Sequence, residues 1–252
     1  MNKLFFAIGF IFSSGFAVVA RAQDAPRPDT LKTIGTFIGV CNSYKQLPLQ
    51  LSLQIDRSSN LPMRPEDSMR TVAVFYLKQE GAYIRMGELE QVVNDSLLLL
   101  VSTTMKRMIL YPNRTSTASQ LKKYLQLSFG DSSIARVAAR YRVGMEKEDA
   151  DSSVIELTSR SVLSGTALPK EVIRMSYRKE GLVPIRLIQT ERQIDLSTKN
   201  ILEKVTTYTW LAITHKKEEQ LPVSIGDRIG IDQSEGYRPL KAYSDFVLIK
   251  NF

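Results

Sequence analysis

Two carboxylates are the only residues of this chain that we consider as candidates for catalysis. Glu88 and Glu90 are two residues apart in a predicted strand, so their side chains would point to the same side. Glycoside hydrolysis uses two carboxylates that flank the scissile bond. Neighbours on one strand leave little room for a substrate, and an exposed polar face beside Lys78 and Arg85 explains the pair better. A carboxylate hydrolase acting on glycan is therefore the weakest functional hypothesis.

Other nucleophiles and bases are scarce. Cys41 is the only cysteine and His215 the only histidine. Unpaired cysteine is usually buried, so we interpret Cys41 as a small core residue rather than a nucleophile, and His215 as a solvated loop residue. One histidine cannot build a multi-histidine zinc site, and the chain contains no Gly-x-Ser-x-Gly elbow, P-loop or dinucleotide fingerprint. The sequence therefore predicts no catalytic residue, no metal site and no cofactor.

The N-terminus predicts export. Lys3 precedes an uncharged apolar run over residues 4–20, and Ala20-Arg21-Ala22 is a small-x-small cleavage site. The run is short and polar chain follows at once, which favours a signal peptide over residues 1–22 rather than a retained signal anchor. We expect cleavage near Ala22, a flexible leader over 23–30 and a single β-rich domain over 31–252. The expected location is the periplasm or another exported compartment.

The charge of the chain is positive. The full chain carries +8, and removal of Lys3 and Arg21 with the signal peptide leaves +6. The favoured interpretation is a solubilising surface with Lys and Arg on exposed strand faces. The alternative is contact with anionic lipid headgroups or polysaccharide, which would be at most a peripheral membrane contact. Nucleic acid is not an expected partner of an exported protein.

The hydrophobic pattern predicts a mainly β fold. Leu47, Leu49, Leu51, Leu53 and Ile55 alternate with polar residues, which indicates a strand with one buried face. Helical spacing predicts a helix from Thr30 to about Tyr44 and an amphipathic helix over 117–129. Short connections indicate antiparallel pairing. Further strands are predicted over 71–78, 82–93, 97–101, 106–111, 136–145, 153–160, 171–178, 182–195, 203–213, 221–232 and 243–250.

The stretch from Val72 to Asn113 resembles a known family. It contains Val74-Phe-Tyr-Leu-Lys, Tyr83-Ile-Arg-Met, Glu90-Gln-Val-Val-Asn-Asp and Lys106-Arg-Met-Ile-Leu-Tyr-Pro in the order strand, turn, strand, turn, strand, strand. This order is similar to the periplasmic lipoprotein-carrier and receptor (Lol) superfamily, and a hairpin from Ile173 to Leu187 resembles the later strands of that family. The resemblance implies an open antiparallel half-barrel, a strongly curved sheet with one or two helices covering its concave face. That apolar face would accept acyl chains.

Binding of an acyl chain needs no catalytic group. Each buried methylene contributes about 0.8 kcal/mol, and soft methionine side chains adapt to variable chains. Our main hypothesis is a non-enzymatic envelope protein that binds a lipid, a lipoprotein or another apolar ligand in the trough of the half-barrel. The alternative is an envelope assembly or adhesion component that binds a protein partner. Our candidate ligand-binding residues are Phe75, Met86, Met108, Met175, Tyr177 and Trp210, although ordinary core packing also explains the methionines.

Overall fold

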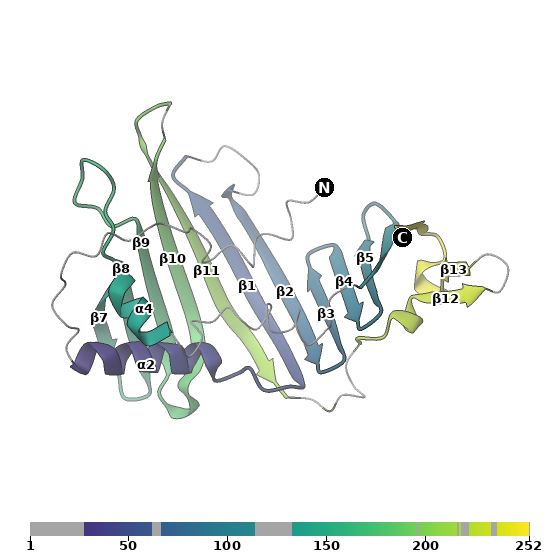
Figure 1. Cartoon of the computed structure of the whole chain (residues 1–252), viewed down its shortest axis with the longest axis horizontal. Coiled ribbons are helices and arrows are strands. Elements are labelled where there is room, and N and C mark those ends of the chain that lie inside the picture. The colour runs from purple at the N-terminus through teal and green to yellow at the C-terminus, as the bar shows by residue number, and fades with distance from the viewer. Residues whose placement is uncertain are drawn as a thin grey trace. The chain divides into compact units, whose positions relative to one another are not determined.

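The fold is mainly β, as the computed structural model in Figure 1 shows. The structure describes residues 28–61, 67–113, 133–195, 197–215, 217, 222–232 and 236–251. The predicted signal peptide over 1–22 and the predicted helix over 117–129 lie outside the described residues. Within the described ranges, no helix is long and apolar enough to cross a membrane.

Helix α2 (Pro28–Asn42) agrees with the predicted N-terminal helix but begins two residues earlier. The fixed φ of Pro28 and its missing N–H suit a first helical turn, and the charge of Asp29 is favourable there. The last three residues of the predicted leader are therefore helical. Cys41 is 6% exposed, which confirms its interpretation as a buried small residue.

Helix α4 (Ser133–Arg140) corrects the predicted strand over 136–145, because strand β7 (Tyr141–Glu148) begins only after it. Val137, Ala138 and Tyr141 are buried, and their spacing matches one face of a helix. Ala and Arg, which make up five of the eight residues of α4, are strong helix formers. The alternation around Val137 was too short to distinguish helix from strand.

The described residues divide into two compact units. Unit 1 is drawn from Met1–Tyr44, Asp56–Met69 and Lys123–Thr209, and unit 2 from Lys45–Ile55, Arg70–Lys122 and Trp210–Phe252. The organisation of 31–252 as one domain stays a prediction.

Unit 1 contains an antiparallel meander. Its strands are β7, β8 (Ser152–Ser159), β9 (Glu171–Arg178), β10 (Val183–Ile194) and the first part of β11 (Ile201–Thr214). The turn between β9 and β10 is a short 3₁₀ helix, η2 (Glu180–Leu182), where Gly181 has a φ of 68°. This confirms the hairpin predicted at Glu180-Gly181. Helix α2 lies across these strands and contacts β7, β10 and α4 (Figure 1).

One face of the unit 1 sheet is the core. Ile155, Leu157, Ile173, Met175 and Tyr177 are each at most 5% exposed, and they alternate with more exposed residues along β8 and β9. The buried side of α2 is equally apolar. Burial of both surfaces places the core of unit 1 between the helices and this face of the sheet.

Unit 2 contains a second meander, of β2 (Met69–Lys78), β3 (Gly81–Met86), β4 (Leu89–Asn94), β5 (Leu97–Ser102) and β6 (Arg107–Pro112). The predicted single strand over 82–93 is wrong. The chain turns at Gly87, whose φ of 57° is open to glycine and costly for other residues. The predicted turn at Asn94 is confirmed, since its Oδ1 accepts the backbone N–H groups of Ser96 and Leu97 at 2.9 and 2.8 Å.

Strand β1 (Leu49–Ser59) confirms the strand with the clearest alternation. Leu49, Leu51, Leu53 and Ile55 are buried, with at most 4% exposure. Leu47, which the pattern placed in the same strand, lies before its start and is exposed.

The C-terminal segment, which we define as residues 222–232 and 236–251, differs from the two strands predicted there. It forms η4 (Ile225–Asp227), β12 (Ile229–Asp232), β13 (Gly236–Pro239), η5 (Lys241–Tyr243) and β14 (Val247–Lys250). Strands β12 and β13 form a separate two-stranded sheet. Strand β14 runs parallel to β6, so the expected antiparallel pairing fails at this strand. The connection from β6 to β14 is long enough to return the chain in the same direction.

Within unit 2 the strands β14-β6-β5-β4-β3-β2 hydrogen bond in this order, and within unit 1 the order is β11-β10-β9-β8-β7. Among the described residues, β14 and β7 each have a strand partner on one side only, so both are edge strands. The predicted fold class, an open and mainly antiparallel β sheet with helices, is confirmed.

Candidate apolar binding face

The register of unit 2 assigns each residue to one of two faces, because directly opposed residues in adjacent strands share a face. One row joins Tyr76, Tyr83, Val92, Leu99 and Leu110. The neighbouring row points to the other side and joins Phe75, Ile84, Gln91, Leu100 and Ile109. We call the first the covered face and the second the apolar face.

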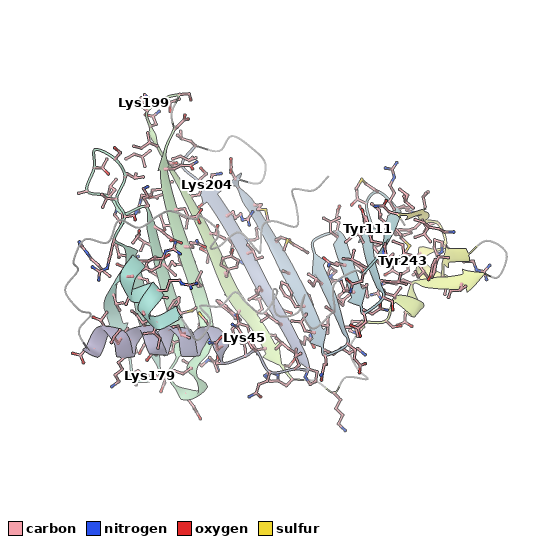
Figure 2. The ribbon with its side chains drawn as sticks, in the orientation of Figure 1. Lys45, Tyr111, Lys179, Lys199, Lys204 and Tyr243 are labelled. Carbon is pink, nitrogen blue, oxygen red and sulfur yellow. The ribbon has the colours of Figure 1, made fainter. Side chains whose placement is uncertain are left out.

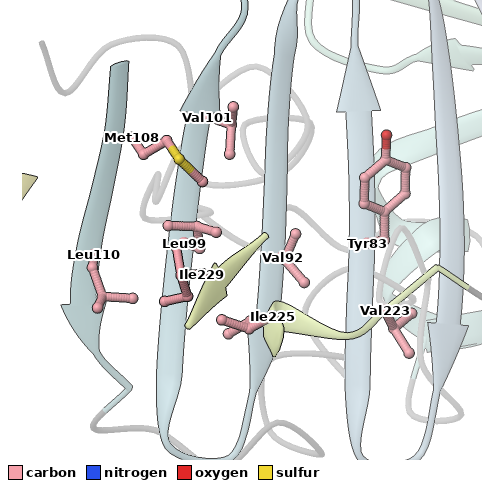
Figure 3. Packing of buried hydrophobic residues seen from close by; sticks show 9 residues of the cluster. All are labelled: Tyr83, Val92, Leu99, Val101, Met108, Leu110, Val223, Ile225 and Ile229. Atoms are coloured by element: carbon pink, nitrogen blue, oxygen red, sulfur yellow. The ribbon is translucent and has the colours of Figure 1, made fainter. Parts of the chain in front are cut away.

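The covered face is closed by the chain itself. Val223, Ile225 and Ile229 of the C-terminal segment pack on it, and Figure 3 shows them over strands β3 to β6. Val92, Leu99, Val101, Met108 and Leu110 beneath them are at most 1% exposed. The side chains of this face are therefore packed in the core and are inaccessible to solvent.

A buried ion pair fastens the C-terminal segment to the covered face. The side chains of Arg228 and Glu90 are 8% and 12% exposed, and Nε of Arg228 lies 3.7 Å from Oε2 of Glu90. Nη1 of Arg228 donates to the backbone oxygen of Ser224 at 2.9 Å, and its guanidinium lies 5.1 Å from the ring centre of Tyr83. The hydroxyl of Tyr243, labelled in Figure 2, donates to Glu90 at 3.3 Å. We call Arg228, Glu90, Tyr83 and Tyr243 the Arg228 cluster.

Burial and the charge of Glu90 raise the pKa of Tyr83 to about 12, and the same two causes raise the pKa of Tyr243. Both phenols therefore stay neutral at physiological pH, and Tyr243 keeps the proton that it donates to Glu90. Nε of Arg228 makes no hydrogen bond to Glu90 at 3.7 Å, so its attraction to the carboxylate is electrostatic, while Nη1 and the hydroxyl of Tyr243 make the hydrogen bonds of the cluster. We therefore interpret the Arg228 cluster as structural: it attaches the C-terminal segment to the covered face.

The carboxylates proposed for glycan hydrolysis are not paired on one strand. Glu90 belongs to β4 and to the Arg228 cluster, whereas Glu88 lies in the exposed turn after Gly87 and accepts a hydrogen bond from the hydroxyl of Thr104. The turn, which separates the two residues, was not visible in the hydrophobic pattern. The hydrolase hypothesis thereby loses the geometry on which it depended.

The apolar face differs from the covered face in its exposure. Phe75, Leu77, Ile84 and Val93, on β2 to β4, are at most 8% exposed. Toward β14 the side chains become accessible: Leu98, Leu100 and Ile109 are half-buried, Ile249 is 42% exposed and Val247 is 62% exposed. We call these last five residues the open end of the apolar face. They form a continuous aliphatic surface, since Ile249 is opposite Ile109, Ile109 opposite Leu100, and Leu98 next in line.

The structure brings two of the six predicted ligand-binding residues to this face. Phe75 is buried on β2, and Met86 is half-buried on β3 opposite Ala73. Met108 lies on the covered face and is fully buried in the core. Trp210 is half-buried on β11.

The other two predicted residues belong to unit 1. Met175 and Tyr177 lie on β9 and are 1% and 5% exposed in its core. Sequence reasoning missed the open end. The signal was present in the uninterrupted run from Leu97 to Val101 and the alternation of Val247 with Ile249, but neither pattern tells which face the chain itself covers.

A polar cluster in unit 1 is satisfied internally. The hydroxyl of Tyr141 donates to Glu171 at 2.5 Å, and Nε2 of Gln189 donates to Glu171 at 2.8 Å and to Glu191 at 2.9 Å. Desolvation, and then the charge of Glu171, raise the pKa of Glu191 although part of its side chain is exposed. Burial raises the pKa of Tyr141. The network orients its own members and serves the packing of unit 1.

His215 is exposed at the end of β11, which confirms its interpretation, and its Nδ1 donates to the carbonyl oxygen of Pro48 at 3.1 Å. Across the described ranges, no group of three or more His, Cys, Asp or Glu residues could hold a metal ion.

Comparison with known proteins gives solved structures of low similarity. No protein-family model and no curated protein matches the chain. The MucA/MucB complex of Pseudomonas aeruginosa matches at 9% identity over 75% of this chain and 60% of that chain, with a TM-score of 0.40. This chain thus spans less than two thirds of that structure.

An uncharacterized conserved protein of Thermus thermophilus matches at 13% identity over 87% of this chain and 99% of that chain, with a TM-score of 0.40. A LolA superfamily protein of Nitrosomonas europaea matches at 9% identity over 73% of this chain and 94% of that chain, with a TM-score of 0.28. A LolA superfamily protein is thus among the solved structures to which this chain is similar. Similarities of this size carry no information on ligand or partner.

Proposed function

We propose that this protein is an exported, non-enzymatic envelope protein that binds an apolar ligand, a lipid or the acyl chain of a lipoprotein, on the apolar face of unit 2. The observation that carries the proposal is the open end of that face. Five aliphatic side chains are half-buried or exposed there, whereas the opposite face is sealed by the C-terminal segment. Contiguous exposed aliphatic surface is a frequent mark of a binding site.

The proposed site would recognise the hydrocarbon part of its ligand by apolar burial, and exposed Arg107, directly opposite Val247, places one cation on the same face. Leu98, Leu100 and Ile109 supply branched side chains without a charge, so they favour a hydrocarbon over a polar ligand. Each methylene that leaves water contributes about 0.8 kcal/mol, which corresponds to about a fourfold gain in affinity per methylene. Affinity should therefore rise with the length of the acyl chain.

The test uses a fluorescent fatty acid whose emission increases in an apolar environment. We expect saturable uptake by the purified chain and a loss of about tenfold or more in affinity when Leu100→Gln and Ile109→Gln are combined. The control is Leu211→Gln, which changes a leucine that is 53% exposed on β11. Equal uptake by the double variant and the control, or no saturable uptake by the wild type, would contradict the proposal.

The alternative function, an assembly or adhesion component that binds a protein partner, is favoured by the position of β14. This strand is the last in the hydrogen-bonding order and has exposed Val247 and Ile249 on it. Edge strands of this kind can pair with an added strand of another chain. Native mass spectrometry of the gently extracted protein distinguishes the two functions: a bound lipid supports the first, and a stoichiometric polypeptide without lipid supports the second.

A further inference from the structure

Helix α4 and the loop between β8 and β9 together present a basic surface in unit 1. Residues 133–142 and 159–170 contain Arg136, Arg140, Arg142, Arg160 and Lys170 but no Asp or Glu. The two segments are joined, because the backbone N–H of Arg160 donates to the carbonyl oxygen of Arg140 at 2.8 Å and its Nε donates to that of Ala138 at 3.2 Å.

Two of these cations face solvent from α4. Arg136 and Arg140 are exposed, and neither has a carboxylate at ion-pair distance within the described part of the chain. Arg142 is opposite Thr158 in β8, so it lies on the sheet face away from the core and from α4 and is not part of this surface. Arg140 lies over the ring of Tyr141, with 5.8 Å between guanidinium carbon and ring centre. The acids on the adjacent strands are occupied elsewhere. Glu171 accepts hydrogen bonds from Tyr141 and Gln189, and Glu156 pairs with Arg174 at 2.8 Å.

The loop adds two projecting aliphatic side chains. Val162 is 49% exposed and Leu168 is 42% exposed. The loop has a defined structure, since Leu163 is buried, its N–H donates to the carbonyl oxygen of Leu168 at 2.9 Å, and the hydroxyl of Thr166 donates to that of Leu163 at 3.1 Å. The exposed positions of Val162 and Leu168 are thus fixed by the loop's own hydrogen bonds.

We propose that this surface, formed by Arg136, Arg140, Val162 and Leu168, docks on the surface of an anionic lipid bilayer. The cations match the negative charge of the lipid headgroups, and aliphatic side chains among cations suit insertion at the boundary between headgroups and acyl chains. Arginine supports both roles, because its stem lies along apolar surface while its guanidinium reaches phosphate. An acidic protein partner would match the cations equally but gives no reason for the two projecting side chains.

The test measures co-sedimentation of the purified chain with vesicles of phosphatidylcholine, with and without one third phosphatidylglycerol. We expect binding to the anionic vesicles, weakened by 0.5 M NaCl, and little binding to pure phosphatidylcholine. Each Arg near an anionic surface is worth about fivefold in affinity, so Arg136→Gln with Arg140→Gln should weaken binding by roughly 25-fold. Val162→Ser with Leu168→Ser should weaken it by about tenfold.

The matched controls remove exposed cations and an exposed leucine outside the proposed docking surface. Arg186→Gln changes an exposed arginine on β10, Lys199→Gln removes a cation at the tip of the β10–β11 hairpin labelled in Figure 2, and Leu211→Ser removes an exposed leucine. Each should bind anionic vesicles within about twofold of the wild type. Circular dichroism and uptake of the fluorescent fatty acid report folding and the apolar face, and both should be unchanged in the test variants.

Three results would overturn the docking proposal. The double Arg variant could bind anionic vesicles as tightly as the controls. The wild type could bind neutral vesicles equally well, or the wild type could bind polyglutamate but no vesicles. The last result would identify an acidic protein as the partner. None of them depends on fatty-acid uptake, so failure of docking and failure of the proposed function are distinguishable.

Discussion

Removal of the arginine in the Arg228 cluster should detach the C-terminal segment from the covered face. In Arg228→Met the aliphatic stem is retained, but Glu90 remains with its side chain 12% exposed and without its cation. Removing one partner of a buried ion pair typically costs about 3–5 kcal/mol of stability, because the other charge is left unpaired in a low-dielectric environment. Because the hydroxyl of Tyr243 still donates to Glu90, we expect the free energy of unfolding to fall by about 3 kcal/mol, the lower end of this range.

Removal of both charges should restore most of that stability. In Arg228→Met with Glu90→Leu no charge is buried, and apolar side chains of similar volume replace the pair. Such replacements are often neutral or stabilising, so the double variant should unfold within about 1 kcal/mol of the wild type. The coupling between the two positions is then the difference between the sum of the single effects and the double effect.

The assay is urea unfolding followed by circular dichroism. The control is Lys106→Gln, which breaks an ion pair between Lys106 and Asp245 that ties the same segment to the sheet but has side chains 61% and 53% exposed. Exposed pairs are worth about 0–1 kcal/mol, so this variant should lose little. The structural role of the Arg228 cluster would be refuted if Arg228→Met and Lys106→Gln each lowered the free energy of unfolding by under about 1 kcal/mol. It would also be refuted if the effects of the Arg228 and Glu90 substitutions were additive.

Three further predictions concern particular residues. Leu99→Ala should lower the free energy of unfolding by about 2–5 kcal/mol, because Leu99 is 0% exposed beneath the C-terminal segment, and urea unfolding compared with Leu211→Ala will show it. Gly87→Val should destabilise by about 1 kcal/mol or more, measured as a lower Tm, because the φ of 57° at the β3–β4 turn strains a β-branched residue. The pKa of Glu191 is raised in the folded state, so Glu191 lowers the free energy of unfolding as the pH rises above the pKa of the unfolded state. Glu191→Gln should therefore raise Tm at pH 7 and change it little at pH 4.

The sequence pattern predicted those elements that are specified by their own residues. The alternation from Leu49 to Ile55 specified β1, and the Glu180-Gly181 turn between two apolar runs specified the β9–β10 hairpin. The predicted bounds of β9, 171–178, agree with the structure. Where two periods fitted the same residues, as from Arg136 to Tyr141, burial against α2 decided in favour of a helix.

The candidate site could not be predicted in the same way, because it depends on which face the chain covers. Met86 and Met108 both lie in strands and both are soft apolar residues. Only the packing of Val223, Ile225 and Ile229 assigns Met108 to a sealed core and leaves the face of Met86 as the candidate site. These contacts join residues more than a hundred positions apart, and no local period records them.

The difference between the two faces of unit 2 is itself an argument for binding. The chain closes the covered face with a segment that is anchored by a buried ion pair, and burying one more leucine or isoleucine would contribute about 1.5–3 kcal/mol. The open end keeps Ile109, Val247 and Ile249 accessible, although β14, on which two of them lie, belongs to that same segment. Stability alone would favour a polar residue at these positions, since a charge on an edge strand also discourages aggregation. Aliphatic residues retained at an accessible edge are best explained by a ligand or partner that covers them when bound.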